Sequence, residues 1–154
     1  MSDSPQRATV DIDVRYAETD AQGVVHHSVY IVWFEVARTS LCDFTGYHYA
    51  AIEDMGYALV VTRSEVRYGA AAHYGDTLAV SCWLEKMASR SVKFQYEVRR
   101  KKAAVPRQPS RSQKDDAAGQ LLASGSTEHI WVELATGRPC RIPEALKEPF
   151  SRLA

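Results

Sequence analysis

The 154-residue sequence lacks an excess of charge of either sign. Its 19 Lys and Arg residues balance 19 Asp and Glu residues, so the formal net charge is zero at pH 7. Proteins that bind nucleic acid or anionic membranes through bulk charge carry a positive excess. The composition therefore argues against that mode of binding and predicts no nucleic-acid partner, although a local basic patch stays open.

Long apolar runs are also missing. The longest, Val29 to Ala37, is interrupted by Glu35 and is much shorter than the roughly 20 residues that span a bilayer. The first ten residues, MSDSPQRATV, are polar and lack the apolar segment of a signal peptide. We therefore expect a cytoplasmic protein with no membrane insertion.

Cysteine is scarce. Cys42, Cys82 and Cys140 are odd in number, lie far apart and form no CxxC pair. This spacing is typical of reduced thiols in a cytosolic protein, and not of a disulfide framework. The sequence also has no metal-ligand cluster and no Gly-rich phosphate loop. It therefore predicts neither a bound metal nor a separate cofactor.

What the sequence does contain is an alternation of apolar and polar residues in five segments. A period of two indicates strands that are half buried. The positions predicted to share one face in each segment are Val10, Ile12, Val14 and Tyr16; Val60, Thr62, Ser64, Val66 and Tyr68; Leu78, Val80, Cys82 and Leu84; Val92, Phe94, Tyr96 and Val98; and Ile130, Val132 and Leu134.

One long segment, between the first two strands, has no period of two. From Val29 to about Phe44 the residues are apolar on most sides, which predicts a helix buried over most of its surface. Ser28 is placed to cap the start of this helix, and Gly46 to end it.

Two shorter helices and a loop complete the outline. We expect helices at Tyr49–Met55, ended by Gly56, and at Pro143–Phe150. A long hairpin loop at about 103–119 follows a basic run and contains two prolines. A single helix that is apolar on most sides needs a sheet around it. The sequence therefore predicts one α+β domain over residues 1–154, with about five antiparallel strands curved around a long central helix.

The stretch TDAQGVVHHSVY, residues 19–30, lies between the first strand and this helix. With the order of elements, it resembles the signature of the hotdog-fold acyl-CoA thioesterases, in the 4-hydroxybenzoyl-CoA and Tol-Pal-associated branch. Asp13 and Val29 depart from residues that are usual there, and the resemblance covers about residues 8–148 outside the loop. The matching positions are Val14, Thr19, Asp20, Gly23, Val24, Val25, His27 and Tyr30.

Thioester hydrolysis needs an activated water or a nucleophile, and donors for the oxyanion that forms. Asp20 has no Ser or Cys beside it, so its carboxylate would act as general base toward water or attack the carbonyl itself; both roles remain open. The resemblance implies that the backbone N–H of His27 binds the thioester oxygen at the positive end of the helix. Since the family accepts Phe at that position, the imidazole of His27 is the lesser candidate. Glu35 is a reserve candidate for the acid.

The resemblance also implies substrate and assembly. CoA would enter as part of an acyl-CoA substrate, and two sheets would join edge to edge in a homodimer, often paired again as a dimer of dimers. Strand residues 61–64 would then complete the partner's site. Arg63, Arg90 and Lys93 could contact the CoA phosphates or be solvated strand-end charges. The residues expected at the substrate are Gly23, Tyr30, Val61, Thr62, Arg63, Ser64 and Arg90.

Two other functions remain as alternatives. One is a hotdog enoyl-CoA hydratase with an Asp/His pair, which the seven-position separation of Asp20 and His27 disfavours. The other is a non-catalytic acyl-CoA-binding module, against which the presence of Asp20 counts.

Overall fold

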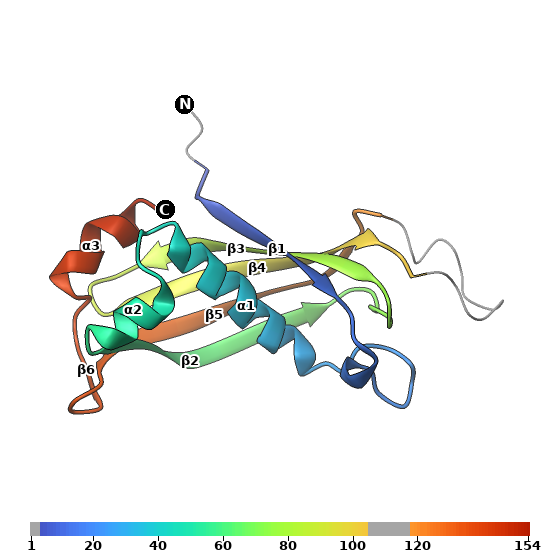
Figure 1. The fold of residues 1–154 in the computed structure, drawn as a ribbon, viewed down its shortest axis with the longest axis horizontal. Helices are drawn as coiled ribbons and strands as arrows, with labels where there is room; N and C mark the ends of the chain where they lie inside the picture. The colour runs from blue at the N-terminus through green and yellow to red at the C-terminus, as the bar shows by residue number, and fades with distance from the viewer. Residues whose placement is uncertain (1–3, 105–117) are drawn as a thin grey trace.

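A curved antiparallel sheet and one long helix make up most of the molecule, in a computed structural model that describes residues 4–104 and 118–154. Figure 1 shows helix α1 (Val29–Asp43) lying across one face of this sheet. The strands, in their order across the sheet, are β1 (Arg7–Asp13), β3 (Thr77–Met87), β4 (Ser91–Lys102), β5 (Leu121–Glu133) and β2 (Tyr57–Tyr68), with the two-residue β6 (Arg138–Pro139) on β5.

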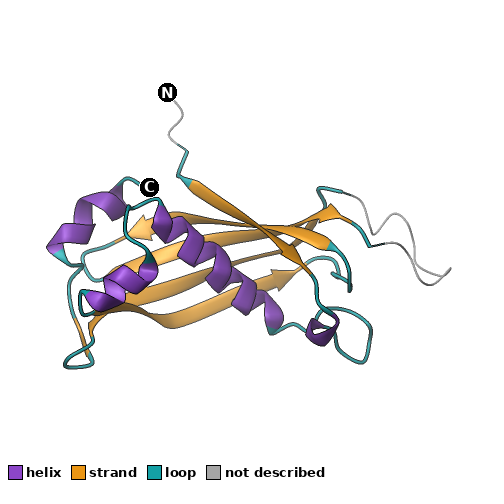
Figure 2. Ribbon diagram, viewed as in Figure 1, coloured by secondary structure: helices purple, strands orange, loops and turns teal. Residues whose placement is uncertain are grey.

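Short helices lie at both ends of the sheet (Figure 2). They are the 3-10 helix η1 (Tyr16–Glu18), α2 (Tyr49–Asp54) and α3 (Glu144–Ser151). The expected helix and strand order is therefore confirmed, although most of the predicted hairpin loop, 105–117, lies outside the described residues. Within 4–104 and 118–154, no helix is long and apolar enough to cross a membrane.

The two central strands confirm their predicted inner faces. Their alternate apolar side chains all lie at 2% exposure or less, because α1 covers these strands. They are Leu78, Val80, Cys82 and Leu84 of β3, and Val92, Phe94, Tyr96 and Val98 of β4.

On β5 the prediction is wrong, because the face formed by Ile130, Val132 and Leu134 is not the one that packs into the core. Thr127, His129 and Trp131 point into the core at 1% exposure or less, whereas Leu134 is half exposed. The buried Thr127 hydroxyl hydrogen-bonds to His129 Nε2 and to the Tyr96 hydroxyl, which offsets part of the cost of burying these polar groups. A pattern that counts only apolar residues therefore assigns the wrong face of this strand to the core.

The outer strands differ from prediction at single positions. Strand β1 ends at Asp13, and Tyr16 begins η1 with 76% of its surface exposed instead of continuing the strand. In β2 the pairing with β5 shifts at Thr62, where a bulge inserts one residue. The bulge moves Val60 to the outer face and leaves Val61 and Ser64 on the side of the sheet that faces α1.

Helix α1 is buried on one side only, which corrects the expectation that it would be buried over most of its surface. Its buried side contacts the sheet through Tyr30, Trp33, Phe34, Ala37, Leu41 and Cys42. On the other side, Ile31, Val32 and Val36 are 42–55% exposed, because the single sheet of one chain covers only one face of the helix.

The ends of α1 are set by main-chain geometry. Ser28 occupies the N-cap position, but its side chain makes no cap hydrogen bond; its Oγ lies 2.7 Å from Nδ1 of His26 instead. After the helix, Gly46 adopts a φ of +83°, the left-handed conformation that ends many helices.

A side chain of helix α1, Phe34, lies directly against Gly125 of β5. The ring of Phe34 lies over this glycine and stacks on Tyr96, with 4.2 Å between ring centroids. A Cβ at position 125 would lie 2.3 Å from the carbonyl oxygen of Glu65 and 2.7 Å from Cε2 of Phe34. The absence of a side chain at this position therefore sets how near the helix can come.

We predict that Gly125→Ala destabilises the protein by about 1–3 kcal/mol, because the methyl group must displace Phe34 and the β2 backbone. Urea denaturation measures the free energy of unfolding. Gly69→Ala is the matched control, since its Cβ would meet nothing nearer than 3.5 Å. Equal stability of the two variants would contradict this account.

Candidate active site

Asp20 lies in a tight turn directly after η1. The turn is closed by hydrogen bonds from the Asp20 N–H to the Val24 carbonyl and from the Gly23 N–H to the Asp20 carbonyl, both 2.9 Å. Gly23 has a φ of +80°, which favours glycine at this position.

The Asp20 carboxylate is half buried, and one of its two oxygens is hydrogen-bonded. Its Oδ1 accepts the N–H of Gln22 at 2.8 Å, which fixes the side-chain direction. Among the described residues, no hydrogen bond or ion pair occupies Oδ2. One oxygen therefore orients the group, and the other is available to a water or a carbonyl carbon.

From Val25 to Val29, where the turn leads into α1, one main-chain N–H group has no acceptor among the described residues. The N–H of Val25 donates to Ala72, that of His26 to Glu18, and that of Val29 to His26, at 2.9–3.0 Å. The backbone N–H of Ser28 donates to the ring Nδ1 of His26 at 3.2 Å. The N–H of His27 has no acceptor among residues 4–104 and 118–154. It lies just before the helix, where the macrodipole favours negative charge.

A tyrosine from the sheet contacts the same residue. The hydroxyl of Tyr68, at the end of β2, donates to the His27 carbonyl at 2.7 Å, and its ring packs edge-on against Tyr30. The His27 side chain is exposed and stacks beside His26, with 4.2 Å between ring centroids. The sequence prediction missed Tyr68, because only its position in space connects it with His27.

A buried ion pair holds the segment before β3, which accepts the Val25 N–H of the site. Arg100 and Asp76, both 0% exposed, pair at 3.4 Å, and an Arg100 guanidinium N–H also donates to the Ala71 carbonyl at 2.6 Å. The N–H of Ala104 donates to Asp76 at 2.7 Å. We call Asp76 and Arg100 the clasp. It holds the segment before β3, including the Ala72 carbonyl that accepts the Val25 N–H.

Apart from Tyr30, which packs against Tyr68 beside His27, the other predicted site residues outside the turn lie away from this centre within one chain. Tyr30 is buried at 3% exposure beside Trp33. Glu35 is exposed on α1. Arg90 lies in the β3–β4 turn, at the opposite end of the sheet from η1 (Figure 1). Among the described residues, no hydrogen bond or ion pair joins 61–64 to the Asp20 turn.

Residues 61–64 are all exposed in the edge strand β2. Thr62 donates to the Glu128 carbonyl at 3.2 Å, and Arg63 pairs with Glu65 at 3.5 Å. Lys93 pairs with Glu85 at 3.2 Å. The basic side chains named for the CoA phosphates are therefore spread over the sheet and do not form one cluster in a single chain.

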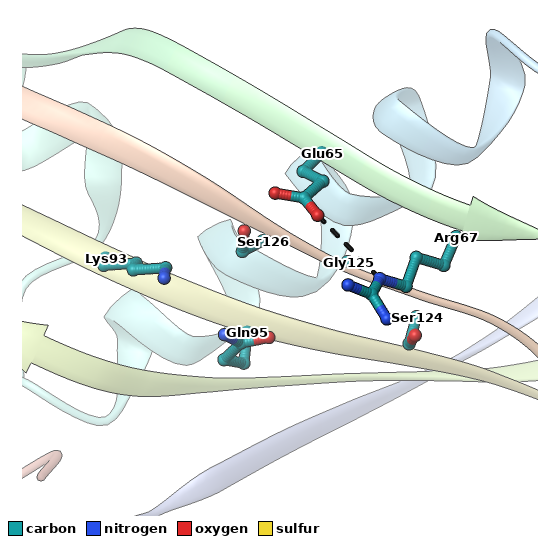
Figure 3. Close-up of a pocket in the computed structure, with 7 residues that line it drawn as sticks. All are labelled: Glu65, Arg67, Lys93, Gln95, Ser124, Gly125 and Ser126. Atoms are coloured by element: carbon teal, nitrogen blue, oxygen red, sulfur yellow. Dashed lines mark ion pairs between the residues drawn. The ribbon is translucent and has the colours of Figure 1, made fainter.

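A hollow of about 310 Å³ lies on the sheet face opposite α1. Figure 3 shows Lys93 and Arg67 beside the small side chains of Ser124 and Ser126. None of the residues predicted for the acid or the oxyanion lines it. Among the described residues, no group of three or more His, Cys, Asp or Glu side chains could hold a metal ion.

A second buried polar group crosses the core away from Asp20. Arg38 Nη1 donates to the Tyr96 hydroxyl at 3.5 Å, this hydroxyl lies 2.6 Å from Thr127 Oγ1, and Thr127 Oγ1 lies 2.7 Å from His129 Nε2. Burial, followed by the positive charge of Arg38, lowers the pKa of His129 to about 3. The ring is therefore neutral at physiological pH and packs as part of the core.

We predict that His129 makes stability depend on pH. Below about pH 6.5 the unfolded chain binds a proton at this residue, while the folded chain stays neutral down to about pH 3. The free energy of unfolding therefore falls by up to about 1.4 kcal/mol per pH unit across that window.

Urea denaturation at pH 7.5 and pH 5 tests this. The drop should be about 2 kcal/mol larger in the wild type than in His129→Gln, because only the wild type has the titrating ring. Taking the difference between the two drops cancels the contributions of all other titrating groups to the free energy of unfolding. Equal drops would assign the pH dependence elsewhere.

Comparisons with known proteins agree with this geometry. Residues 14–150 match the model of the thioesterase-like superfamily. YneP of Bacillus subtilis, named as a proposed acyl-CoA thioesterase, is 30% identical over 138 residues, which cover 90% of this chain and 88% of YneP. The acyl-CoA thioesterase YbgC of Haemophilus influenzae is 26% identical over 145 residues, covering 92% and 93%.

Solved structures give the same result. A hypothetical protein from Thermus thermophilus superposes with a TM-score of 0.80 at 33% identity, covering 97% of this chain and 98% of the other. The DHNA-CoA thioesterase of Staphylococcus aureus superposes with a TM-score of 0.79 at 31% identity, covering 94% and 89%. This chain therefore belongs to the thioesterase-like superfamily, as a thioester hydrolase with the hotdog fold.

Proposed function

We propose that this protein hydrolyses an acyl- or aroyl-CoA thioester to a carboxylic acid and CoA, with Asp20 as its acid–base or nucleophilic group. The observation that carries the proposal is the His27 N–H, which has no acceptor among the described residues and follows the turn that holds Asp20. A negative charge developing on a carbonyl oxygen would complete this hydrogen bond. Relatives named as acyl-CoA thioesterases support CoA as the leaving group.

The chemistry can follow two balanced routes. As a general base, Asp20 takes a proton from water while the water oxygen attacks the thioester carbon. The tetrahedral oxyanion accepts from His27 N–H, then collapses and expels CoA thiolate, which takes up the proton. As a nucleophile, Asp20 attacks the carbon and expels the thiolate, and water then hydrolyses the mixed anhydride. Both routes consume one water.

We infer that the working enzyme is a homodimer, and that two dimers pair further. Strand β2 is 12 residues long and forms an edge of the sheet, with β5 as its described neighbour. Val61 on β2 is 46% exposed, and Ile31, Val32 and Val36 on α1 are also exposed. A long unpaired edge beside an apolar helix face is suited to a second copy of the same chain. In that arrangement Val61, Thr62, Arg63 and Ser64 would line the partner's site.

We predict that Asp20→Asn lowers kcat by about 10² to 10⁴, because the amide is neither a base nor a nucleophile. The assay offers short aliphatic, hydroxybenzoyl and dihydroxynaphthoyl-CoA substrates and detects free CoA with a thiol reagent. A hydratase would consume enoyl-CoA without releasing thiol, and a binding module would do neither. Asp20→Asn activity above about a tenth of wild type would move the role elsewhere, with Glu35 as the next candidate.

His27→Phe is the companion variant in the same assay. It removes the imidazole and keeps the backbone N–H, so the backbone role predicts substantial remaining activity. A loss of kcat as large as that of Asp20→Asn, with an unchanged circular dichroism spectrum, would show that the imidazole takes part.

We predict that the dimer shares its sites, which mixed dimers can test. An Asp20→Asn chain and a Ser64→Trp chain should each be inactive alone. Mixed and refolded 1:1, half the dimers are heterodimers, and each has one site with both native residues, so about a quarter of wild-type activity returns. Activity of Ser64→Trp alone, or no recovery on mixing, would contradict a shared site.

A further inference from the structure

Glu18 is a buried carboxylate two residues before Asp20. It is 7% exposed, and a carboxylate removed from water is costly unless its oxygens have partners. Its Oε1 accepts the backbone N–H of Arg15 at 2.8 Å and lies 3.4 Å from Nε of the same arginine. Its Oε2 accepts the indole N–H of Trp33, which lies on α1, at 3.0 Å.

The main chain of Glu18 makes a further contact. Its carbonyl accepts the N–H of His26 at 2.9 Å. The next N–H along the chain is that of His27, the proposed oxyanion donor. Glu18 therefore contacts helix α1 with its side chain and the peptide preceding the donor with its backbone.

Glu18 is also connected to the acid through a short, hydrogen-bonded segment. Only Thr19 separates Glu18 from Asp20, and Thr19 is itself fixed by hydrogen bonds from its N–H and its hydroxyl to the Tyr16 carbonyl, at 3.1 and 2.7 Å. Asp20 then begins the closed turn to Val24. A shift of Glu18 relative to α1 would therefore change the distance between the Asp20 carboxylate and the His27 N–H.

We propose that Glu18 is a positioning residue, whose hydrogen bond to Trp33 sets the spacing between the Asp20 carboxylate and the His27 N–H. This inference rests on the proposed roles of Asp20 and His27. Its consequence is kinetic. A misplaced acid slows the chemical step, whereas CoA binding, which uses other parts of the substrate, is little affected. A purely structural carboxylate would change stability and leave the turnover of the folded enzyme intact.

Two single variants and their combination test the hydrogen bond. Glu18→Gln retains the shape and an acceptor for Arg15, but its amide NH₂ would face the indole N–H of Trp33, donor against donor. Trp33→Phe removes that N–H and retains an aromatic ring. In the double variant the amide no longer opposes a donor. Glu53→Gln, an exposed carboxylate on α2, is the matched control.

We expect Glu18→Gln to lower kcat about 10- to 100-fold and Trp33→Phe about 3- to 10-fold, with KM within about threefold of wild type. The double variant should regain at least about fivefold in kcat over Glu18→Gln, and Glu53→Gln should match wild type. All rates are taken per folded enzyme, with the folded fraction measured by circular dichroism.

The outcomes separate this inference from the proposed function. If wild type releases no CoA from any substrate, the proposed function fails and the inference fails with it. If Asp20→Asn is inactive while Trp33→Phe and any folded Glu18→Gln keep full kcat, the function stands and the positioning role is refuted. A fall in melting temperature without a fall in kcat also refutes it. Should Glu18→Gln not fold, Trp33→Phe alone decides.

Discussion

One helix has to cover one face of a six-stranded sheet, and the rest of the structure depends on how it does so. Helix α1 packs so close to the sheet that Gly125 of β5 has no room for a side chain beneath Phe34. The helix buries the inner faces of β3 and β4 but leaves most of β2 and one side of α1 exposed. The same placement brings the start of the helix to the end of the sheet where Tyr68 and the Asp20 turn lie.

The candidate site is built largely from main-chain groups. The proposed oxyanion donor is a backbone N–H, and the turn before it is closed by backbone hydrogen bonds. Side chains act on these groups from outside: Tyr68 contacts the His27 carbonyl, and Glu18 joins the turn to the helix through Trp33. A site of this kind can change the side chain at position 27 while keeping its donor, provided that the contacts around the backbone remain.

Local patterns predicted most of the elements, because period and end signals act over a few residues. The helix at Val29, the five long strands and the turn at Asp20 follow from such signals. The errors come from long-range effects. His129 is buried with its Nε2 on Thr127, which in turn bonds to Tyr96 of the neighbouring strand, and Val32 is exposed because one sheet covers only one side of its helix. Glu18 and Tyr68 could not be assigned, since their partners Trp33 and His27 become neighbours only in the folded chain.

The clasp of Asp76 and Arg100 has a consequence for how this protein can evolve. It ties Arg100 and Ala104, at the end of β4, to the segment before β3, and the Gly119 N–H returns to the Arg100 carbonyl at 2.6 Å. Both chain ends that flank residues 105–117 are thus anchored before that stretch begins. Loss of either charge would therefore disturb the end of β4 and the segment that carries Ala72 together, so these two positions can change only as a pair.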